Sequence, residues 1–223
     1  SIIPKAIIVV HLYGMPAKMN EILKIASRFN VPVVEDAAEA LGSKIDGVPC
    51  GSFGRLSILS FNGNKIITTS GGGAILSDND QDIIEANFLS TQAKENRPFY
   101  DHKKLGYNYK LSNILSSIGV EQQKVLGKRV KKRRDNYIFY YNLLGKVNGV
   151  KFLNEPSGYF SNIWLTFIFV DKKKSGISAD KIISKLEDEK IETRRLWKPM
   201  HMQPIFKEAK FFGNGISTSV FCL

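Results

Sequence analysis

One lysine stands in a turn between two apolar, β-type runs, where its amine could act as a nucleophile. The run Ile58–Phe61 leads into Asn62-Gly-Asn64, then comes Lys65, and a β-branched run, Ile66–Thr69, follows. A lysine held on such a turn can be partly desolvated, which frees its amine to attack a carbonyl group. A hairpin with a solvated lysine at its tip explains the same local pattern, because Asn-Gly is a common hairpin turn.

An acidic residue upstream could complete a site around this lysine. The apolar run Ala6–Val10 predicts a buried strand, Met19–Phe29 has helical spacing, and Val31–Val34 predicts a second buried strand. Strand, helix and strand form a βαβ unit with parallel strands, and ligands bind at the carboxyl ends of such strands. Asp36 is expected at one of these ends. His11 is expected at the other, as a structural residue.

A fixed carboxylate and a fixed lysine are what a pyridoxal phosphate site requires. Lys65 would form the Schiff base with the cofactor's aldehyde, and Asp36 would pair with the protonated pyridine nitrogen, so that the ring can take up electrons. A structural salt bridge uses the same residue types. The pair alone therefore leaves both interpretations open.

Composition excludes several classes of protein. The 223 residues are 43% hydrophobic and 24% charged, as in ordinary globular proteins. No apolar run approaches the roughly 20 residues that span a bilayer, so no membrane association is expected. Two cysteines without metal-ligand spacing argue against a disulfide scaffold or zinc site and favour the cytoplasm. Because the chain opens at Ser1 and stops in an apolar segment, we expect it to be part of a longer protein.

Much of the net charge of +11 lies in residues 124–134. Val125, Leu126, Val130 and Tyr137 keep helical spacing through this run, which is typical of a helix with one buried face. The aromatic residues or fold motifs of nucleic-acid modules do not accompany the charge, so no nucleic-acid partner is expected. A basic surface also suits a doubly negative small substrate such as a nucleotide diphosphate.

The remaining elements follow from periodicity and turn signals. We expect Ser77, Asp78 or Asp80 to cap the helix that begins near residue 80. In the long helix that begins at residue 112, we expect Gly119 to be a weak point and Gly145 to end the helix. A boundary near residue 148 divides a large domain (1–147) from a small one (148–223). The expected helices cover 80–91, 112–144 and 179–190, and the expected later strands cover 164–170 and 191–195.

Four motifs in order resemble the DegT/DnrJ/EryC1/StrS family of nucleotide-sugar aminotransferases, and the resemblance covers essentially the whole chain. Ser90–Ala93 and Trp197–His201 resemble the branch with perosamine synthases and enzymes of bacillosamine- or legionaminic-type sugars. The resemblance implies an α/β fold, the fold-type I transferase, with a mainly parallel sheet flanked by helices and a smaller C-terminal α/β domain. The four motifs are Glu35–Ser43, Gly51–Gly54, Ser60–Thr69 and Gly106–Asn113.

The resemblance also implies roles for individual residues. Lys65 would bind the cofactor's aldehyde and move the proton, Asp36 would hold the pyridine nitrogen, and Ser60 would bind the phosphate. Asn108 would reach the phosphate of a partner subunit's cofactor, which implies a homodimer with shared active sites. A loop would face the nucleotide-sugar, although its histidine could equally be a packed structural residue; the loop residues are Trp197, Lys198 and His201.

This chain departs from the family pattern at three points. Glu39 stands where many members use Gln or His to bond the cofactor's 3-oxygen, and a carboxylate there would be repelled unless protonated or bridged by a donor. Arg195 stands where proline is usual. An N-terminal region that supplies cofactor contacts in the family is missing from the chain, so we expect weak cofactor binding if these residues are the whole molecule.

The expected function is transfer of an amino group, with glutamate as donor, to a nucleotide-linked 4-keto-6-deoxyhexose for surface polysaccharide or glycan synthesis. The family's sugar dehydratases carry histidine in place of the lysine, so Lys65 argues against that activity. A non-catalytic fragment or regulatory paralogue that keeps the fold and dimer surface is the alternative.

Overall fold

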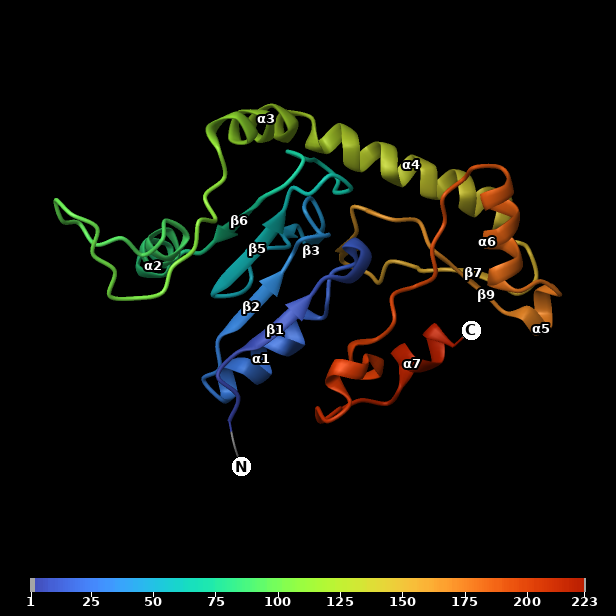
Figure 1. Ribbon diagram of the computed structural model, residues 1–223. Helices are drawn as coiled ribbons and strands as arrows, with labels where there is room; N and C mark the ends of the chain where they lie inside the picture. Colours follow the sequence, from blue (N-terminus) through green and yellow to red (C-terminus); the bar gives the residue numbers. More distant parts are fainter. Residues whose placement is uncertain (1–2, 223) are drawn as a thin grey trace. The chain divides into compact units, whose positions relative to one another are not determined.

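The computed structural model describes residues 3–222 and separates into two compact units (Figure 1). Of the described residues, the first unit comprises 3–137 and 155–166, and the second comprises 138–154 and 167–222. The chain therefore leaves the first unit and returns to it, and we call residues 155–166 the return segment. The division into domains at residue 148 stays a prediction.

A four-stranded sheet forms the centre of the first unit, in the order β1–β2–β5–β6. The first three strands are parallel and β6 is antiparallel to β5, which confirms the predicted α/β fold with a mainly parallel sheet. Helix α1 (Met19–Arg28) connects β1 to β2 and completes the expected βαβ unit. The strands are β1 (Ile7–Val10), β2 (Val33–Asp36), β5 (Leu56–Ser60) and β6 (Gly73–Leu76).

One face of this sheet packs on helix α1. Among the described residues, little covers the other face, which is largely exposed. Val9 and Val33 contact Met19 and Ala26 of the helix in the core. On the opposite face, Ile8 is 71% exposed. The prediction that Ala6–Val10 is buried throughout was therefore wrong, because successive side chains of a strand point to opposite faces.

The lysine-bearing stretch is a wide loop, where a tight turn between two strands was expected. Strand β5 ends at Ser60, which pairs with Gly73, so Ile66–Thr69 is not the second strand. Backbone bonds from Phe61 to Gly72 and from Thr69 to Phe61 close the loop. Ile66 and Ile67 are both buried, and consecutive buried side chains do not fit the alternation of a half-exposed strand.

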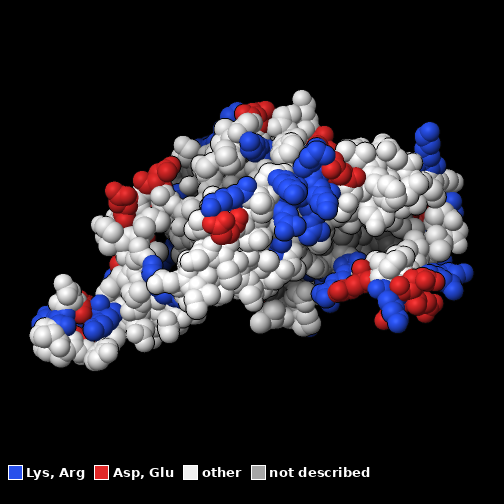
Figure 2. Space-filling model, turned by 90° about the horizontal axis from the view of Figure 1, so that it is seen from above, with Lys and Arg blue, Asp and Glu red and all other residues white. Residues whose placement is uncertain are grey.

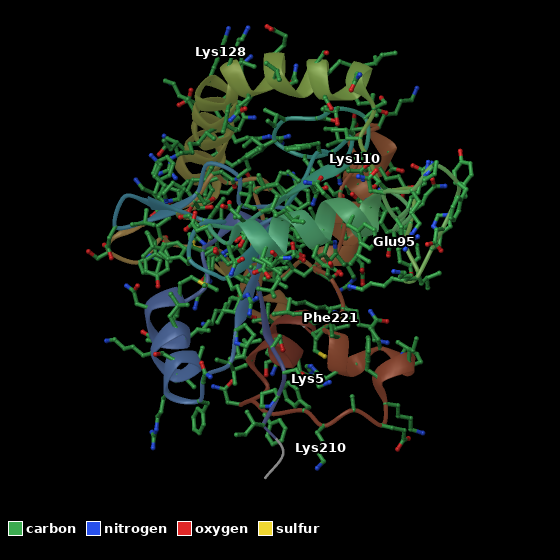
Figure 3. All side chains as sticks on the ribbon, turned by 90° about the vertical axis from the view of Figure 1, so that its left-hand side faces the viewer. Lys5, Glu95, Lys110, Lys128, Lys210 and Phe221 are labelled. Carbon is green, nitrogen blue, oxygen red and sulfur yellow. The ribbon has the colours of Figure 1, made fainter. Side chains whose placement is uncertain are left out.

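Helix α2 (Asp80–Ser90) begins as predicted, but its cap is Asn79 instead of Ser77, Asp78 or Asp80. The Asn79 side-chain oxygen accepts hydrogen bonds from the backbone N–H groups of residues 81 and 82. A loop of residues 92–111, which carries Glu95 and Lys110, extends away from this helix (Figures 1 and 3).

The predicted long helix is two helices, α3 (Asn113–Lys124) and α4 (Leu126–Leu144), which break at Val125. Gly119 does not interrupt α3. A Cβ there would lie 3.1 Å from a methyl group of Thr69, so this glycine permits close packing on the lysine loop. Helix α4 stops before Gly145, as expected.

The basic run forms an exposed surface on α4. Val130 is buried while Lys128, which points outward in Figure 3, is exposed, so the prediction of one buried helical face is confirmed. Figure 2 shows Lys and Arg side chains gathered on this face of the molecule.

The second unit holds a two-stranded antiparallel sheet of β7 (Val150–Phe152) and β9 (Ile168–Val170) with short helices. Strand β9 begins at Ile168, not at Trp164, and residues 191–195 form no strand. The helices are α5 (Lys172–Ser175), α6 (Ala179–Asp188) and α7 (Ile216–Phe221), with 3₁₀ turns at Met200–Met202 and Pro204–Phe206.

The return segment is fixed to the first unit by a small sheet and an ion pair. Its strand β8 (Tyr159–Phe160) pairs with β3 (Lys44–Ile45), which also pairs with β4 (Val48–Pro49). The Arg134 guanidinium donates to both oxygens of Glu155, at 2.6 and 2.9 Å, and to the Ser161 carbonyl.

A comparison of two glycines tests how tightly the return segment packs. Gly14 lies in the 3₁₀ turn Leu12–Gly14 with φ +85°, and a Cβ there would overlap the side-chain oxygen of Asn162. Gly47 has φ +84° but open space around it. We expect Gly14→Ala to lower the free energy of unfolding by about 3 kcal/mol, and Gly47→Ala by about 1 kcal/mol, in chemical denaturation. Equal losses would show that the return segment does not pack on this turn.

Candidate active site

Lys65 lies in an enclosed position beside an acid and an aromatic ring. Its side chain is 13% exposed, and its Nζ lies 3.9 Å from Oε1 of Glu39 and 4.5 Å from the ring centroid of Trp164. The solvated hairpin tip that the local pattern also allowed is therefore not what the fold contains. The amine is held between a carboxylate and a π face.

Glu39 is buried in the turn that follows β2, and its other oxygen accepts a 2.6 Å hydrogen bond from the Tyr13 N–H. Burial raises the pKa of this carboxyl group above its usual value, and the negative charge of Asp36 adds to the effect. The Tyr13 N–H and the Lys65 ammonium act in the opposite direction. The neutral acid is thus easier to form at Glu39 than at an ordinary surface glutamate.

Asp36 ends strand β2, with Val10 and Ile58 as its register neighbours on the adjacent strands. Its Oδ1 accepts a hydrogen bond from the Ala38 N–H at 3.1 Å, which fixes the carboxylate at the strand end. Ser60 lies on the same face of the sheet, because it is two residues beyond Ile58 on β5. Glu39 lies 3.9 Å from the Lys65 amine and feels the charge of Asp36, and Ser60 is on the strand next to that of Asp36.

Glu35 turns to the opposite face and is the most heavily bonded acid of this region. It is fully buried and accepts hydrogen bonds from backbone N–H groups, at 2.8, 2.6 and 2.7 Å, and from the Ser57 hydroxyl. Burial opposes its ionisation, but the bonds from His11 and the loop N–H groups outweigh burial and lower its pKa to about 2. The three N–H groups belong to Gly51, Phe53 and Gly54.

His11 is a structural partner of this carboxylate, in agreement with the expectation. Its Nδ1 accepts a hydrogen bond from the Ala17 N–H at 3.0 Å, so the proton of the neutral ring is on Nε2, which donates to Glu35 at 2.9 Å. The Glu35 carboxylate thereby ties the loop after β1 to the loop before β5.

Trp164 and Asn162 of the return segment are site residues that sequence reasoning missed. The indole N–H of Trp164 donates to the Asn64 carbonyl at 2.9 Å, directly before Lys65. The amide of Asn162 donates to the carbonyls of Glu39 and Leu41. The sequence gives no local signal for these contacts, since they join residues about 100 or more positions apart.

The other predicted site residues lie elsewhere in the chain. Asn108, in the loop 92–111, is exposed and forms an isolated antiparallel β-bridge with Thr91. Trp197 and Lys198 are exposed in the second unit. In the same unit, His201 bonds the Thr218 hydroxyl at 2.7 Å and stacks on Phe211. The contacts of His201 favour the packed histidine that the sequence left open.

Residues 3–222 contain no cluster of acids, histidines and cysteines suited to a metal ion. Within the same residues, no helix combines the length and apolar character needed to cross a membrane.

Comparison with known proteins shows which family the chain belongs to. The profile of the DegT/DnrJ/EryC1/StrS aminotransferase family matches residues 3–216. The chain belongs to this family. EpsN of Bacillus subtilis, assigned as a pyridoxal phosphate-dependent aminotransferase, is 48% identical over 218 residues, which are 98% of this chain and 55% of EpsN.

Two further relatives agree with this assignment. The GDP-perosamine synthase of Vibrio cholerae is 32% identical over 91% of this chain and 55% of its own length. A solved DegT DnrJ EryC1 StrS aminotransferase from Brucella abortus superposes with a TM-score of 0.81 and 30% identity, over 92% of this chain and 53% of that one. The chain thus spans about half the length of the relatives it matches.

The residues present fit pyridoxal phosphate, the cofactor of this family. A lysine amine with little exposure and a carboxylate at a strand end lie on neighbouring segments, as covalent and ionic partners of the cofactor must. Glu39, whose pKa is raised, adds a group able to donate a hydrogen bond as the neutral acid.

The Glu35 network predicts a stability change at acidic pH. Because its pKa is lowered to about 2, its contribution of about 3 kcal/mol is present above about pH 4.5 and is lost as the pH falls toward 2. We expect Glu35→Gln to destabilise the first unit by about 3 kcal/mol at neutral pH and to flatten this acid limb in denaturant titrations.

Glu21→Gln is the matched control, because Glu21 is an exposed acid on α1. It should leave both the free energy of unfolding and the acid limb close to those of the unmodified protein. An acid limb that persists unchanged in Glu35→Gln would contradict the assignment.

Proposed function

We propose that the full-length protein containing this chain is a pyridoxal phosphate-dependent aminotransferase. It transfers an amino group, with glutamate as donor, to the ketone of a nucleotide-linked 4-keto-6-deoxyhexose. The observation that carries this proposal is the enclosed amine of Lys65 close to Glu39, with Asp36 at the neighbouring strand end. The 48% identity to EpsN supports the cofactor and the type of reaction, and the similarity to GDP-perosamine synthases supports a nucleotide-linked sugar as substrate.

The bound cofactor supplies an electron sink for the carbon from which a proton is removed. The residues of this chain would hold and move protons around the cofactor. The Asp36 carboxylate is fixed by the Ala38 N–H and would keep a proton on the pyridine nitrogen. The amine of Lys65 would hold the aldehyde and would carry the proton to and from the substrate carbon.

Glu39 is proposed to bond the cofactor's 3-oxygen as a neutral acid. A carboxylate beside that negatively charged oxygen would be repelled, but the pKa of Glu39 is raised, first by burial and then by the charge of Asp36. Glu39 could therefore donate its proton to the oxygen while the Tyr13 N–H holds the other carboxyl oxygen. This role would account for the departure from Gln or His at this position.

The remaining assignments belong to the same proposal. Ser60 binds the cofactor phosphate, and Asn108 reaches the phosphate of a partner subunit's cofactor in a homodimer. In the loop of Trp197, Lys198 and His201, the exposed Trp197 and Lys198 face the nucleotide-sugar, while His201 packs on Phe211. The activity is placed in the cytoplasm, in the synthesis of surface polysaccharide or glycan sugars, and uses neither nucleic acid nor membrane as a partner.

Trapping of the cofactor tests the central residue. We expect borohydride treatment of the full-length protein with pyridoxal phosphate to attach one pyridoxyl phosphate group to Lys65, identified by peptide mass spectrometry. Lys65→Ala should lose this adduct and all amination of a nucleotide-4-keto sugar by glutamate. Lys44→Ala, at an exposed lysine of β3, should retain both.

An adduct on another lysine, or amination that survives in Lys65→Ala, would contradict the proposed role of Lys65. Specific attachment without turnover of any nucleotide-4-keto sugar would instead favour a non-catalytic member that keeps the cofactor site.

A further inference from the structure

Trp164 contacts the lysine loop at two separate points. Its indole N–H bonds the carbonyl of Asn64, and its ring lies 4.5 Å from the Lys65 ammonium. One side chain thus holds both the backbone just before the lysine and the amine at the end of the lysine side chain. Trp164 is 2% exposed, so its own position is fixed by packing.

The amine is held from two sides. Glu39 faces it at 3.9 Å, and this carboxylate is itself fixed by the Tyr13 N–H. An aromatic face attracts an ammonium group most strongly where water is excluded, and the Lys65 side chain is largely enclosed here. The pair of Trp164 and Glu39 therefore forms a site that suits the free, protonated amine.

The backbone around Trp164 is strained in a way that fixes its direction. Ile163 has φ +48°, which is unfavourable for a β-branched residue and persists only where surrounding contacts enforce it. Asn162 supplies those contacts, because its Oδ1 accepts from the Trp164 N–H while its amide bonds the carbonyls of Glu39 and Leu41. Asn162 thereby links both walls of the lysine site.

We propose that Trp164 is a positioning residue for Lys65: with Glu39, it holds the amine in one place whenever the amine is not bound to the cofactor. In the proposed function an amino donor would free this amine, so the inference rests on the proposed function of Lys65. An amine that stays in place is ready to move the proton and to rebind the aldehyde. The return segment, although remote in sequence, thus serves the catalytic lysine.

Amine labelling of the cofactor-free, full-length protein tests this position directly. Acetic anhydride reacts with the unprotonated, accessible amine, and mass spectrometry measures the rate at Lys65 relative to the exposed Lys44. Trp164→Leu removes the ring and the indole N–H, and should raise the relative rate at Lys65 at least about threefold. Trp164→Phe keeps a ring but loses the bond to Asn64, and should give a smaller rise.

Cys50 reports whether the first unit stays folded, because its thiol is buried and burial, followed by the charge of Glu35, raises its pKa to about 12. It should stay unreactive toward a thiol reagent in both variants. If Cys50 becomes reactive in Trp164→Leu, the relative labelling rate of Lys65 in Trp164→Phe tests the proposal instead. Lys65 rates equal to the unmodified protein in the folded variants, or a Lys65 gain that always accompanies Cys50 exposure, would overturn the proposal.

Failure of this inference differs from failure of the proposed function. If borohydride trapping attaches no cofactor to Lys65 of the unmodified protein, the aminotransferase proposal fails. The labelling rates compare cofactor-free proteins and test the contact between Trp164 and Lys65 in either case.

Discussion

The carboxylate of Glu35 is buried at the end of β2, and the site on the other face of the sheet depends on how that charge is satisfied. An ionised carboxylate without partners would be far too costly to bury, but this one accepts hydrogen bonds from three backbone N–H groups, a hydroxyl and an imidazole. The bonds pull together the loops after β1 and before β5. The next residue, Asp36, is then presented at a fixed strand end.

Three separate segments meet around Lys65. The turn after β2 supplies Glu39, the loop between β5 and β6 supplies the lysine, and the return segment supplies Trp164. Asn162 bonds the carbonyl of Glu39 and the backbone of Trp164, so the two walls do not move independently. A broken contact in the return segment would therefore disturb a lysine about 100 residues earlier in the chain.

Part of this arrangement could be predicted from the sequence. Short apolar runs with a helical segment between them indicated the βαβ unit, and that unit brings Asp36 to the carboxyl edge of the sheet. The burial of Glu35 had a signal that was available, because alternation places it on the same face as the buried Val33. For this reason the consecutive acids Glu35 and Asp36 point to opposite faces of the sheet.

Other features depend on tertiary contacts that local patterns do not carry. Ile66–Thr69 has the composition of a strand, yet buried contacts and closing backbone bonds make it part of a loop. Gly119 resembled a weak point, but it serves a close approach to Thr69. Trp164 resembled the start of a strand, and only the return of the chain to the first unit brings it to Lys65.

The most direct measurement is the protonation state of the cofactor's pyridine nitrogen in the full-length protein. Pyridoxal phosphate labelled with ¹⁵N at that position reports it by NMR. If Asp36 holds the nitrogen as proposed, the signal is that of a protonated ring at neutral pH, and Asp36→Asn shifts it to the unprotonated position. An unprotonated nitrogen in the unmodified protein, or a protonated nitrogen that persists in Asp36→Asn, would contradict the account.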